Sequence, residues 1–517
     1  MRPASSGPRV VSAAPGEARR EVARSPRAAA TPHARSPASS TPSCTTRGAA
    51  PAVAAAFAAL LPACRVGREH EVPAVAVPEA WAEAGPGAIA AEAEERWWTR
   101  FGDPRLDALV ERASAANLDL AAAAARVREA RALRDEVAGG RAPAVDARAG
   151  YARVGPSDNT FQGAIAGAGG FEDYDDWSVG FDALWELDLF GRTGRAIEAA
   201  ERGVEAAEAD RRAALVAVRG EVARAYVELR GLQRQLALTR ANLALQEDTL
   251  ALTEVRFRGG FAPELDVARS SALVATTRAQ IPSLDAQALA AVHRIGVLLG
   301  EPPEALRAEL ADAAPIPVAP AEVALGVPGD VLRRRPDVAR AERELARAAS
   351  LSAQATADLY PRFVIGASYG RQSLEGGDLF DAASEAWSVG PSLVAPLFRG
   401  GALRARVRAA DARVDQAAAA YEAAVLEALR EVEDALAAVR RERARLAELE
   451  RAVESNRRAA ELATDLQARG LVDFFEVLDA QRQQLAAETE LARSETALST
   501  QAVALYKALA GGWDGAE

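Results

Sequence analysis

Three carboxylates stand three positions apart near the end of the chain, at Asp473, Glu476 and Asp479. Side chains at this spacing lie roughly on one face of a helix, so they would present a strip of negative charge that favours cations. A simpler explanation needs no function, because acidic residues also suit the positive end of a helix dipole. Asp473 fits this second explanation, since it directly follows a break at Gly470.

Catalytic chemistry finds little support in the chain. There are three histidines, and no cluster has the spacing of a metal site or of a catalytic nucleophile. The glycine run at 167–170 lacks the lysine of a phosphate-binding loop. The formal net charge of −11 argues against nucleic acid as a partner. We therefore expect no enzyme activity, no metal and no diffusible cofactor.

The elements that must position the carboxylates belong to an internal repeat. The segment Trp-Ser-Val-Gly at 177–180 returns 210 positions later at 387–390, and Glu-Val at 221–222 returns at 431–432. Arg258-Gly259 returns as Arg469-Gly470, 211 positions later. A nearly constant shift over such a span predicts two copies of one structural unit, which we place at 106–310 and 331–513, joined by a linker at 311–330.

Four segments alternate between apolar and polar residues and are predicted to be strands, at about 143–154, 176–190, 361–371 and 386–398. Their length and the aromatic residues near their ends are typical of transmembrane strands, although an ordinary sheet on a soluble core is an alternative. Four strands cannot close a barrel, and lipid does not tolerate open sheet edges. If the strands span a membrane, several copies of the chain must share one barrel.

The remaining sequence of each unit carries apolar stripes with helical spacing. We predict helices at about 106–140, 192–257, 264–299, 331–359, 400–467 and 473–510. The two longest would each extend about 100 Å. Each of them ends in a glycine-containing break, at Gly259-Gly260 and at Gly470, and turns into a return helix.

Residues 1–63 are predicted to be an export leader, because an arginine-rich stretch is followed by a short apolar run and then by Cys64. Leu-Pro-Ala-Cys at 61–64 is similar to a bacterial lipobox, which predicts a covalent lipid on Cys64 and an anchored segment at 64–105. Pro62 is unusual in that motif, and a buried or free thiol is the alternative. The leader is long for this class of signal, so a start after Met1 remains open.

Blocks throughout the chain resemble TolC-family outer-membrane channels, and most closely the OprM-type lipoprotein branch. The most specific blocks are Trp-Glu-Leu-Asp-Leu-Phe-Gly at 185–191 and Arg-Arg-Pro-Asp-Val at 334–338. The resemblance covers about residues 60–513. Two departures are Arg-Glu-His at 68–70, where the family has Pro-Asp-Tyr, and Ala510, where glycine is common.

This resemblance implies an α+β membrane protein made of two tandem repeats, each a β-hairpin with long coiled-coil helices. Three copies would form a shared 12-stranded β-barrel in the outer membrane and an α-helical barrel in the periplasm. The implied partners are a periplasmic adaptor (a membrane fusion protein) and an inner-membrane resistance–nodulation–division pump. The implied function is a passive exit duct for small molecules. A duct for type I protein secretion and, more distantly, a soluble coiled-coil scaffold are the alternatives.

The resemblance also assigns roles to residues at the breaks between helices. It implies that Asp473, Glu476 and Asp479 line a gate at the periplasmic closure, where three copies would form anionic rings. Asp266 would help to hold the turns closed; the arginine that the family can use near Val472 is absent, and Arg469 is a substitute. The residues expected to make contacts at the turns are Arg258, Gly259, Gly260, Asp266, Arg469 and Gly470.

Overall fold

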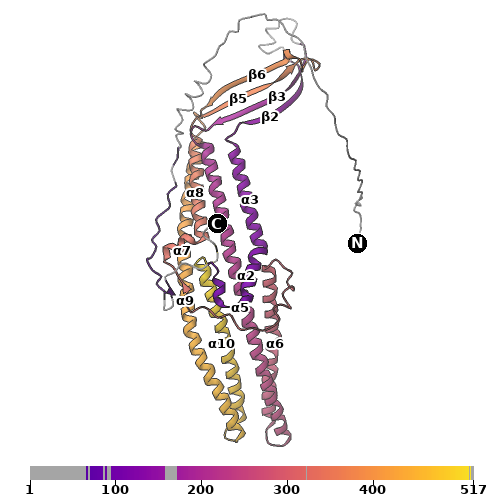
Figure 1. Ribbon diagram of the computed structural model, residues 1–517, viewed down its shortest axis with the longest axis vertical. Helices are drawn as coiled ribbons and strands as arrows, with labels where there is room; N and C mark the ends of the chain where they lie inside the picture. The colour runs from indigo at the N-terminus through magenta and orange to yellow at the C-terminus, as the bar shows by residue number, and fades with distance from the viewer. Residues whose placement is uncertain are drawn as a thin grey trace, which may run out of the picture. The chain divides into compact units, whose positions relative to one another are not determined.

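The computed structural model describes residues 66–67, 70–84, 88–89, 95–155, 157, 172–321, 323–511 and 513. The predicted leader, Cys64 and the glycine run at 167–170 lie outside the described residues. Within the described part, one antiparallel sheet lies at one end of a set of long helices, and two helix–helix turns lie at the other end (Figure 1).

The sheet contains four strands in the order β2-β3-β5-β6, so the hairpins of the two repeats lie side by side. Its strands are β2 (Ala144–Val154), β3 (Tyr174–Leu187), β5 (Arg362–Ser373) and β6 (Glu385–Val394). The strand predicted over 386–398 ends earlier than expected, at Val394. Pro396 follows two residues later, and a proline has no N–H to donate to a partner strand.

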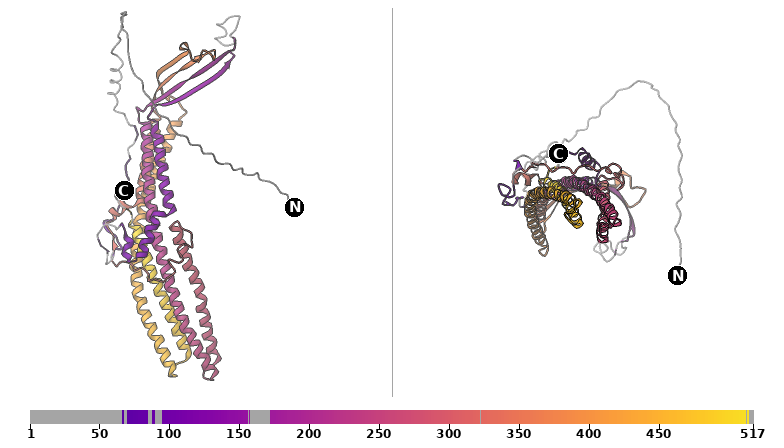
Figure 2. Two further views of the ribbon diagram at one scale, coloured as in Figure 1. Left: turned by 45° about the vertical axis from the view of Figure 1, so that its right-hand side comes forward. Right: turned by 90° about the horizontal axis from the view of Figure 1, so that it is seen from below.

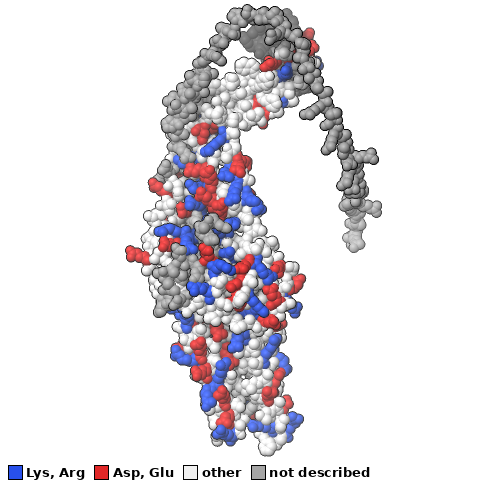
Figure 3. Space-filling model, viewed as in Figure 1, with Lys and Arg blue, Asp and Glu red and all other residues white. Residues whose placement is uncertain are grey.

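The strand register aligns residues of neighbouring strands in rows across the sheet, and one of these rows is mainly aromatic. Ala147 stands opposite Phe181, Phe181 opposite Tyr369, and Tyr369 opposite Trp387. Paired residues share a face, so the three rings project from the same side, and each is more than half exposed. The adjacent rows on the other face carry small and polar side chains such as Ser368 and Ser388, whose hydroxyls lie 2.8 Å apart. Most of the visible surface of the sheet is uncharged, whereas residues of both charges are scattered along the helices (Figure 3).

Eight α-helices of the described chain carry the remaining fold. They are α2 (Pro104–Ala116), α3 (Leu118–Gly139), α5 (Arg192–Arg258), α6 (Glu264–Leu298), α7 (Pro328–Arg334), α8 (Pro336–Ala357), α9 (Ala402–Ala468) and α10 (Phe474–Ala508). Short elements complete it: η1 (Trp97–Phe101), η3 (Ala382–Ser384) and the parallel pair β1 (Ala88–Ile89) and β4 (Val323–Ala324). None of the described helices is both long and apolar enough to cross a membrane.

Two of the predicted helices are divided in the structure. The helix expected over 106–140 breaks at Asn117, which has an extended ψ of 133° and whose side chain accepts from the N–H groups of Asp119 and Leu120. This is an N-cap, and an asparagine favours it over a helix interior. The helix expected over 331–359 begins three residues earlier, at Pro328, and breaks at Arg335, because Pro336 disfavours helical geometry in the residue before it.

The shorter helices meet end to end. Asn117 Nδ2 donates to the carbonyl of Leu298 at 2.8 Å, which joins the start of α3 to the end of α6. Arg335 Nη1 donates to the carbonyl of Ala508 at 2.8 Å, which joins the start of α8 to the end of α10. Each repeat therefore contributes one continuous helix and one column of two stacked helices.

The four columns follow each other in a curved layer, in the order α3/α6, α5, α8/α10 and α9 (Figure 2). The continuous helices α5 and α9 are equally long, but their burial differs. Of 67 residues each, α5 buries 24 and α9 buries 8. Within one chain, α5 is thus an interior column and α9 an edge column.

The largest apolar cluster lies where the columns meet their short neighbours η1 and α2. Trp97 stacks on Tyr506 with ring centroids 5.2 Å apart, and Phe101 packs edge-on against the same ring. Tyr226 of α5 donates its hydroxyl to Asp103 Oδ2 at 2.7 Å. Burial, aided by this hydrogen bond, raises the pKa of Tyr226 to about 12, so the bond persists over the whole physiological pH range.

The residues that follow α6 and α10 share a left-handed backbone conformation at equivalent positions of the two repeats. Beyond α6, Gly300 has φ 72°, and Glu301 N–H bonds to the Gly296 carbonyl at 2.9 Å. Beyond α10, 210 residues later, Ala510 takes the same place with φ 55°. Glycine adopts this left-handed conformation without strain, whereas a Cβ makes it unfavourable. Ala510 is the one non-glycine residue with positive φ in the described chain.

We predict that Ala510→Gly stabilises the protein by about 0.5–1 kcal/mol, because the relief of left-handed strain exceeds the added entropy of the unfolded chain. Gly300→Ala should destabilise it, since the new Cβ would lie 2.6 Å from the Ala116 carbonyl oxygen. Thermal unfolding of the purified protein in detergent measures both changes. An equal decrease in melting temperature in both variants would contradict the equivalence of the two positions.

Candidate functional site at the helix turns

Both turns have the same backbone and lie 210 residues apart. After α5, Gly259 remains helical and Gly260 has φ 77°; Phe261 N–H then bonds to the Arg256 carbonyl at 2.8 Å. After α9, Arg469 remains helical and Gly470 has φ 72°. This is the common glycine-terminated helix end. The predicted match of Arg258-Gly259 with Arg469-Gly470 was therefore one residue off, because the left-handed glycine fixes the alignment.

Side chains at the turns make local contacts. Arg258 Nε donates to the Glu254 carbonyl at 3.3 Å, and Arg469 forms an ion pair with Asp465 at 2.8 Å. Asp266 is half-buried, and its N–H bonds to the Pro263 carbonyl at 3.1 Å. Within one chain Arg469 thus pairs with a residue of its own helix. That Arg469 is a partner of Asp266 stays a prediction, and it concerns contacts between different copies of the chain.

The three predicted gate carboxylates occupy different settings. Asp473 is the N-cap residue of α10, is exposed, and makes no side-chain cap hydrogen bond. Glu476 is exposed in the first turn of α10. Asp479 is half-buried and paired with Arg482 at 2.5 Å. Two of the three therefore present free negative charge at the turn, and the third is partly neutralised by its own helix.

A contact between the two repeats near the turns was not anticipated. The guanidinium of Arg269 on α6 lies 5.3 Å from the ring centroid of Phe475 on α10, within the range of a cation–π interaction. Phe475 is half exposed. The two residues are 206 positions apart, and nothing in the local sequence of either one indicates the other.

The block Arg-Arg-Arg-Pro-Asp-Val encloses a buried ionic junction. The side chain of Arg335 is 7% exposed and pairs with Asp337 at 2.7 Å and with Glu431 at 2.6 Å, in addition to its bond to the Ala508 carbonyl. One guanidinium thus ties α8, α9 and α10 together. Burial raises the pKa of Asp337, but the hydrogen bond and the positive charge of Arg335, together with backbone hydrogen bonds, outweigh it and leave that pKa below its usual value.

Across the part of the chain that the structure describes, no three His, Cys, Asp or Glu side chains are grouped so that they could hold a metal ion. The geometry of the turns supports electrostatic attraction and mechanical coupling between helices.

Comparison with known proteins gives a consistent result. The family model described as outer membrane efflux protein matches residues 109–301 and 327–511. The pyoverdine export outer membrane protein OpmQ of Pseudomonas aeruginosa is 32% identical over 440 residues, which cover 85% of this chain and 92% of that protein.

Two solved structures share the architecture. The outer-membrane channel OprN is 39% identical, with a TM-score of 0.82, and the match covers 87% of this chain and 100% of that one. The open state of the MtrE outer membrane channel of Neisseria gonorrhoeae is 26% identical, with a TM-score of 0.76, covering 87% and 98%.

The junction at Arg335 predicts a pH dependence. Because the pKa of Asp337 is lowered in the folded state, its contribution to stability is present above about pH 4, the pKa of an unperturbed aspartate, and is lost as pH falls through the lower folded value. Asp337→Asn should remove about 1 kcal/mol at neutral pH, a small value because the side chain is 43% exposed and solvent screens the pair.

Chemical denaturation at pH 7 and pH 3 measures this effect. The difference in free energy of unfolding between wild type and Asp337→Asn should be smaller at the lower pH. Asp330→Asn is the matched control, since Asp330 pairs with Arg333 in the same block but both side chains are exposed. If Asp337→Asn lowers the free energy of unfolding as much at pH 3 as at pH 7, the stabilising role of the Asp337 charge is contradicted.

Proposed function

Given that this chain belongs to the outer membrane efflux protein family, we propose that three copies form one continuous duct from the outer membrane into the periplasm. The family identifies the chain as an outer-membrane efflux channel.

The observation that carries the trimer is that every layer of one chain ends in an open edge. In the sheet, β2 and β6 are the outer strands. In the helical layer, α3 and α6 form one edge and α9 forms the other. Because β2 continues from α3 and β6 continues into α9, each edge of the sheet leads into the corresponding edge of the helical layer. A neighbouring copy could therefore complete all layers along one line.

Energetics favour such a closure. Strand edges left unpaired in lipid would expose N–H and C=O groups that find no water. Twelve strands from three copies would pair all of these edges, and the exposed aromatic row through Phe181, Tyr369 and Trp387 would face lipid. The 67-residue helices α5 and α9 would extend about 100 Å away from the membrane.

We assign the periplasmic adaptor and the inner-membrane resistance–nodulation–division pump to the turns at the far end of the helices. The cargo is proposed to be small molecules, because the related OpmQ is named for pyoverdine export. Export of proteins remains the second candidate by fold alone. A lipid on Cys64, which lies outside the described residues, is proposed to anchor the N-terminal segment at the membrane.

At the turns, Asp473 and Glu476 of three copies are proposed to form the anionic closure, with Asp479 beside them. Their exposure supports this role, and the Asp479–Arg482 pair weakens the contribution of the third ring. Flow through the duct is passive, so the turns act as a gate.

Oligomeric state is the first test. Purified from outer membranes in detergent, the protein should have a mass of three chains by light scattering after subtraction of the detergent, and should insert into planar bilayers as a conducting pore. A stable, non-conducting monomer would refute the proposed duct.

Ion selectivity is the second test. Replacing Asp473, Glu476 and Asp479 together by Asn, Gln and Asn should shift the reversal potential in a salt gradient toward lower cation preference, because the field at the narrowest point weakens. Glu304→Gln, an exposed carboxylate in the loop after α6, is the control and should leave it unchanged. If the triple variant also leaves it unchanged, these residues do not line the pore.

A further inference from the structure

Helix α5 changes character along its length. Between Val216 and Leu236 its buried side chains are mostly apolar. Beyond Leu236, every buried residue of α5 is polar: Thr239, Asn242, Gln246 and Thr253. Together with Gln235 and Thr249 these residues recur every three or four positions. This is the spacing at which a coiled coil normally places its apolar seam.

This polar seam faces α10 of the other repeat. Three side-chain hydrogen bonds cross between the helices, and along α5 they are seven residues apart. Arg493 donates to Gln235 at 3.3 Å, Asn242 donates to Glu488 at 3.4 Å, and Gln481 donates to Thr249 at 3.2 Å. All three are at the long end of the hydrogen-bond range, so each holds the two helices together weakly.

Several buried groups on and beside the seam have no protein partner. Gln246 is 2% exposed, and neither its Oε1 nor its Nε2 is bonded within the described chain. The same holds for Oε1 of Gln481, which is 4% exposed, and for Oγ of Ser270 on α6, which is 2% exposed. A buried polar group without a partner is costly, and native proteins satisfy it with ordered water.

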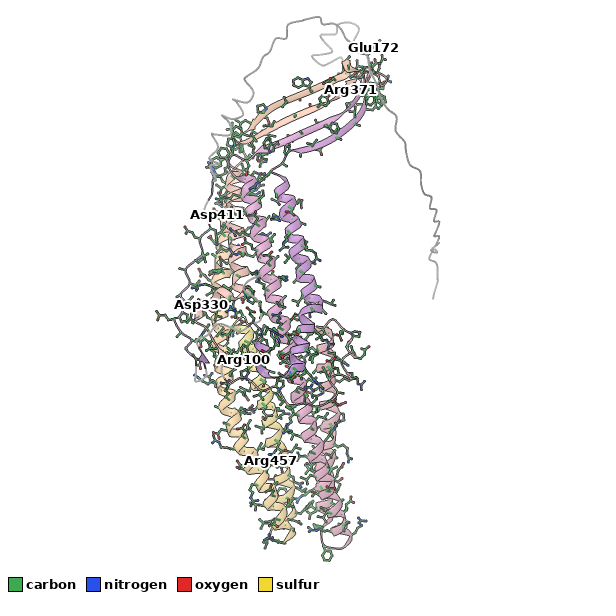
Figure 4. All side chains as sticks on the ribbon, viewed as in Figure 1. Arg100, Glu172, Asp330, Arg371, Asp411 and Arg457 are labelled. Carbon is green, nitrogen blue, oxygen red and sulfur yellow. The ribbon has the colours of Figure 1, made fainter. Side chains whose placement is uncertain are left out.

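The helices that meet at each turn, α5 with α6 and α9 with α10, form two helical hairpins. Each helical hairpin contains an ion pair between its own two helices, whereas the three side-chain hydrogen bonds described between the hairpins are long. Within the first, Arg278 of α6 pairs with Glu247 of α5 at 2.5 Å. Within the second, Arg457 of α9 pairs with the buried Glu488 of α10 at 2.7 Å (Arg457 is labelled in Figure 4). The charge of Glu488 is therefore compensated inside its own hairpin, and separation from Asn242 leaves it paired.

We propose that the α5 seam binds a file of internal water molecules and is the line along which the two hairpins of one chain part when the turns open. This inference rests on the proposed function and specifies which interface yields. Parting an apolar seam would expose nonpolar surface to water, which is unfavourable in proportion to the area exposed. Parting a polar, hydrated seam exchanges one set of water contacts for another at little cost.

The test is to make the seam apolar without changing its volume much. Gln246→Leu removes an amide that has no hydrogen-bond partner among the described residues. It should raise the melting temperature of the trimer, because the leucine would pack where water was held. It should also lower the open fraction of single channels in planar bilayers about tenfold. Thr277 of α6 is 2% exposed and lies seven residues after the buried Ser270, on the same face of that helix. Thr277→Val should therefore change the melting temperature and the open fraction in the same direction, by a smaller amount.

A matched control lies next in the chain. Thr276 is exposed and bonds to the Ala272 carbonyl of its own helix, so Thr276→Val should change neither the melting temperature nor the open fraction. High-resolution structures of wild type and Gln246→Leu should show ordered water along the seam in the first and its loss in the second.

The outcomes separate this inference from the proposed function. If wild type forms no conducting trimer, the duct itself is refuted. If wild type conducts but Gln246→Leu melts lower, fails to fold or opens as often as wild type, the duct stands and the seam is not the line of parting. An unchanged open fraction for Thr277→Val together with a raised melting temperature would also overturn the link to opening.

Discussion

Unpaired backbone at the edges of the four-stranded sheet is the constraint on which the rest of this structure depends. One chain leaves the outer sides of β2 and β6 without a neighbouring strand, and a membrane interior offers those N–H and C=O groups nothing in exchange. The helices continue the same two edges, with α3 and α6 on one side and α9, few of whose residues are buried, on the other. In the proposed trimer, a single line of association would therefore serve the sheet and the whole length of the helical layer.

The two repeats join their stacked helices at equivalent places, but with different residues. At the first junction the small amide of Asn117 both caps α3 and binds the end of α6. At the second, the same connection to the end of α10 is made by the long side chain of Arg335, which also reaches Glu431 on α9. The second junction therefore holds a neighbouring column as well, and this requires a charge pair where the first needs only an amide.

Much of the fold could be predicted from the chain, because strands and helices impose different periods on it. The aromatic alternation through Phe181 and the glycine breaks at Gly260 and Gly470 are local signals, and the family was identified from blocks such as that around Pro336. Other features depend on contacts distant in sequence. The break at Asn117 places its side-chain amide against a carbonyl 181 residues away. Asp479 is partly neutralised by Arg482, a pairing that an inspection of the acidic residues alone does not reveal.

The stacked columns have a mechanical consequence. Two of the four columns, α3/α6 and α8/α10, are interrupted at mid-length, and each is joined there by a side chain bound to a helix-terminal carbonyl. The backbone runs unbroken from sheet to turn only in α5 and α9. Torque applied near the turns would therefore reach the sheet through continuous backbone only in alternate columns, and through side-chain contacts in the other two.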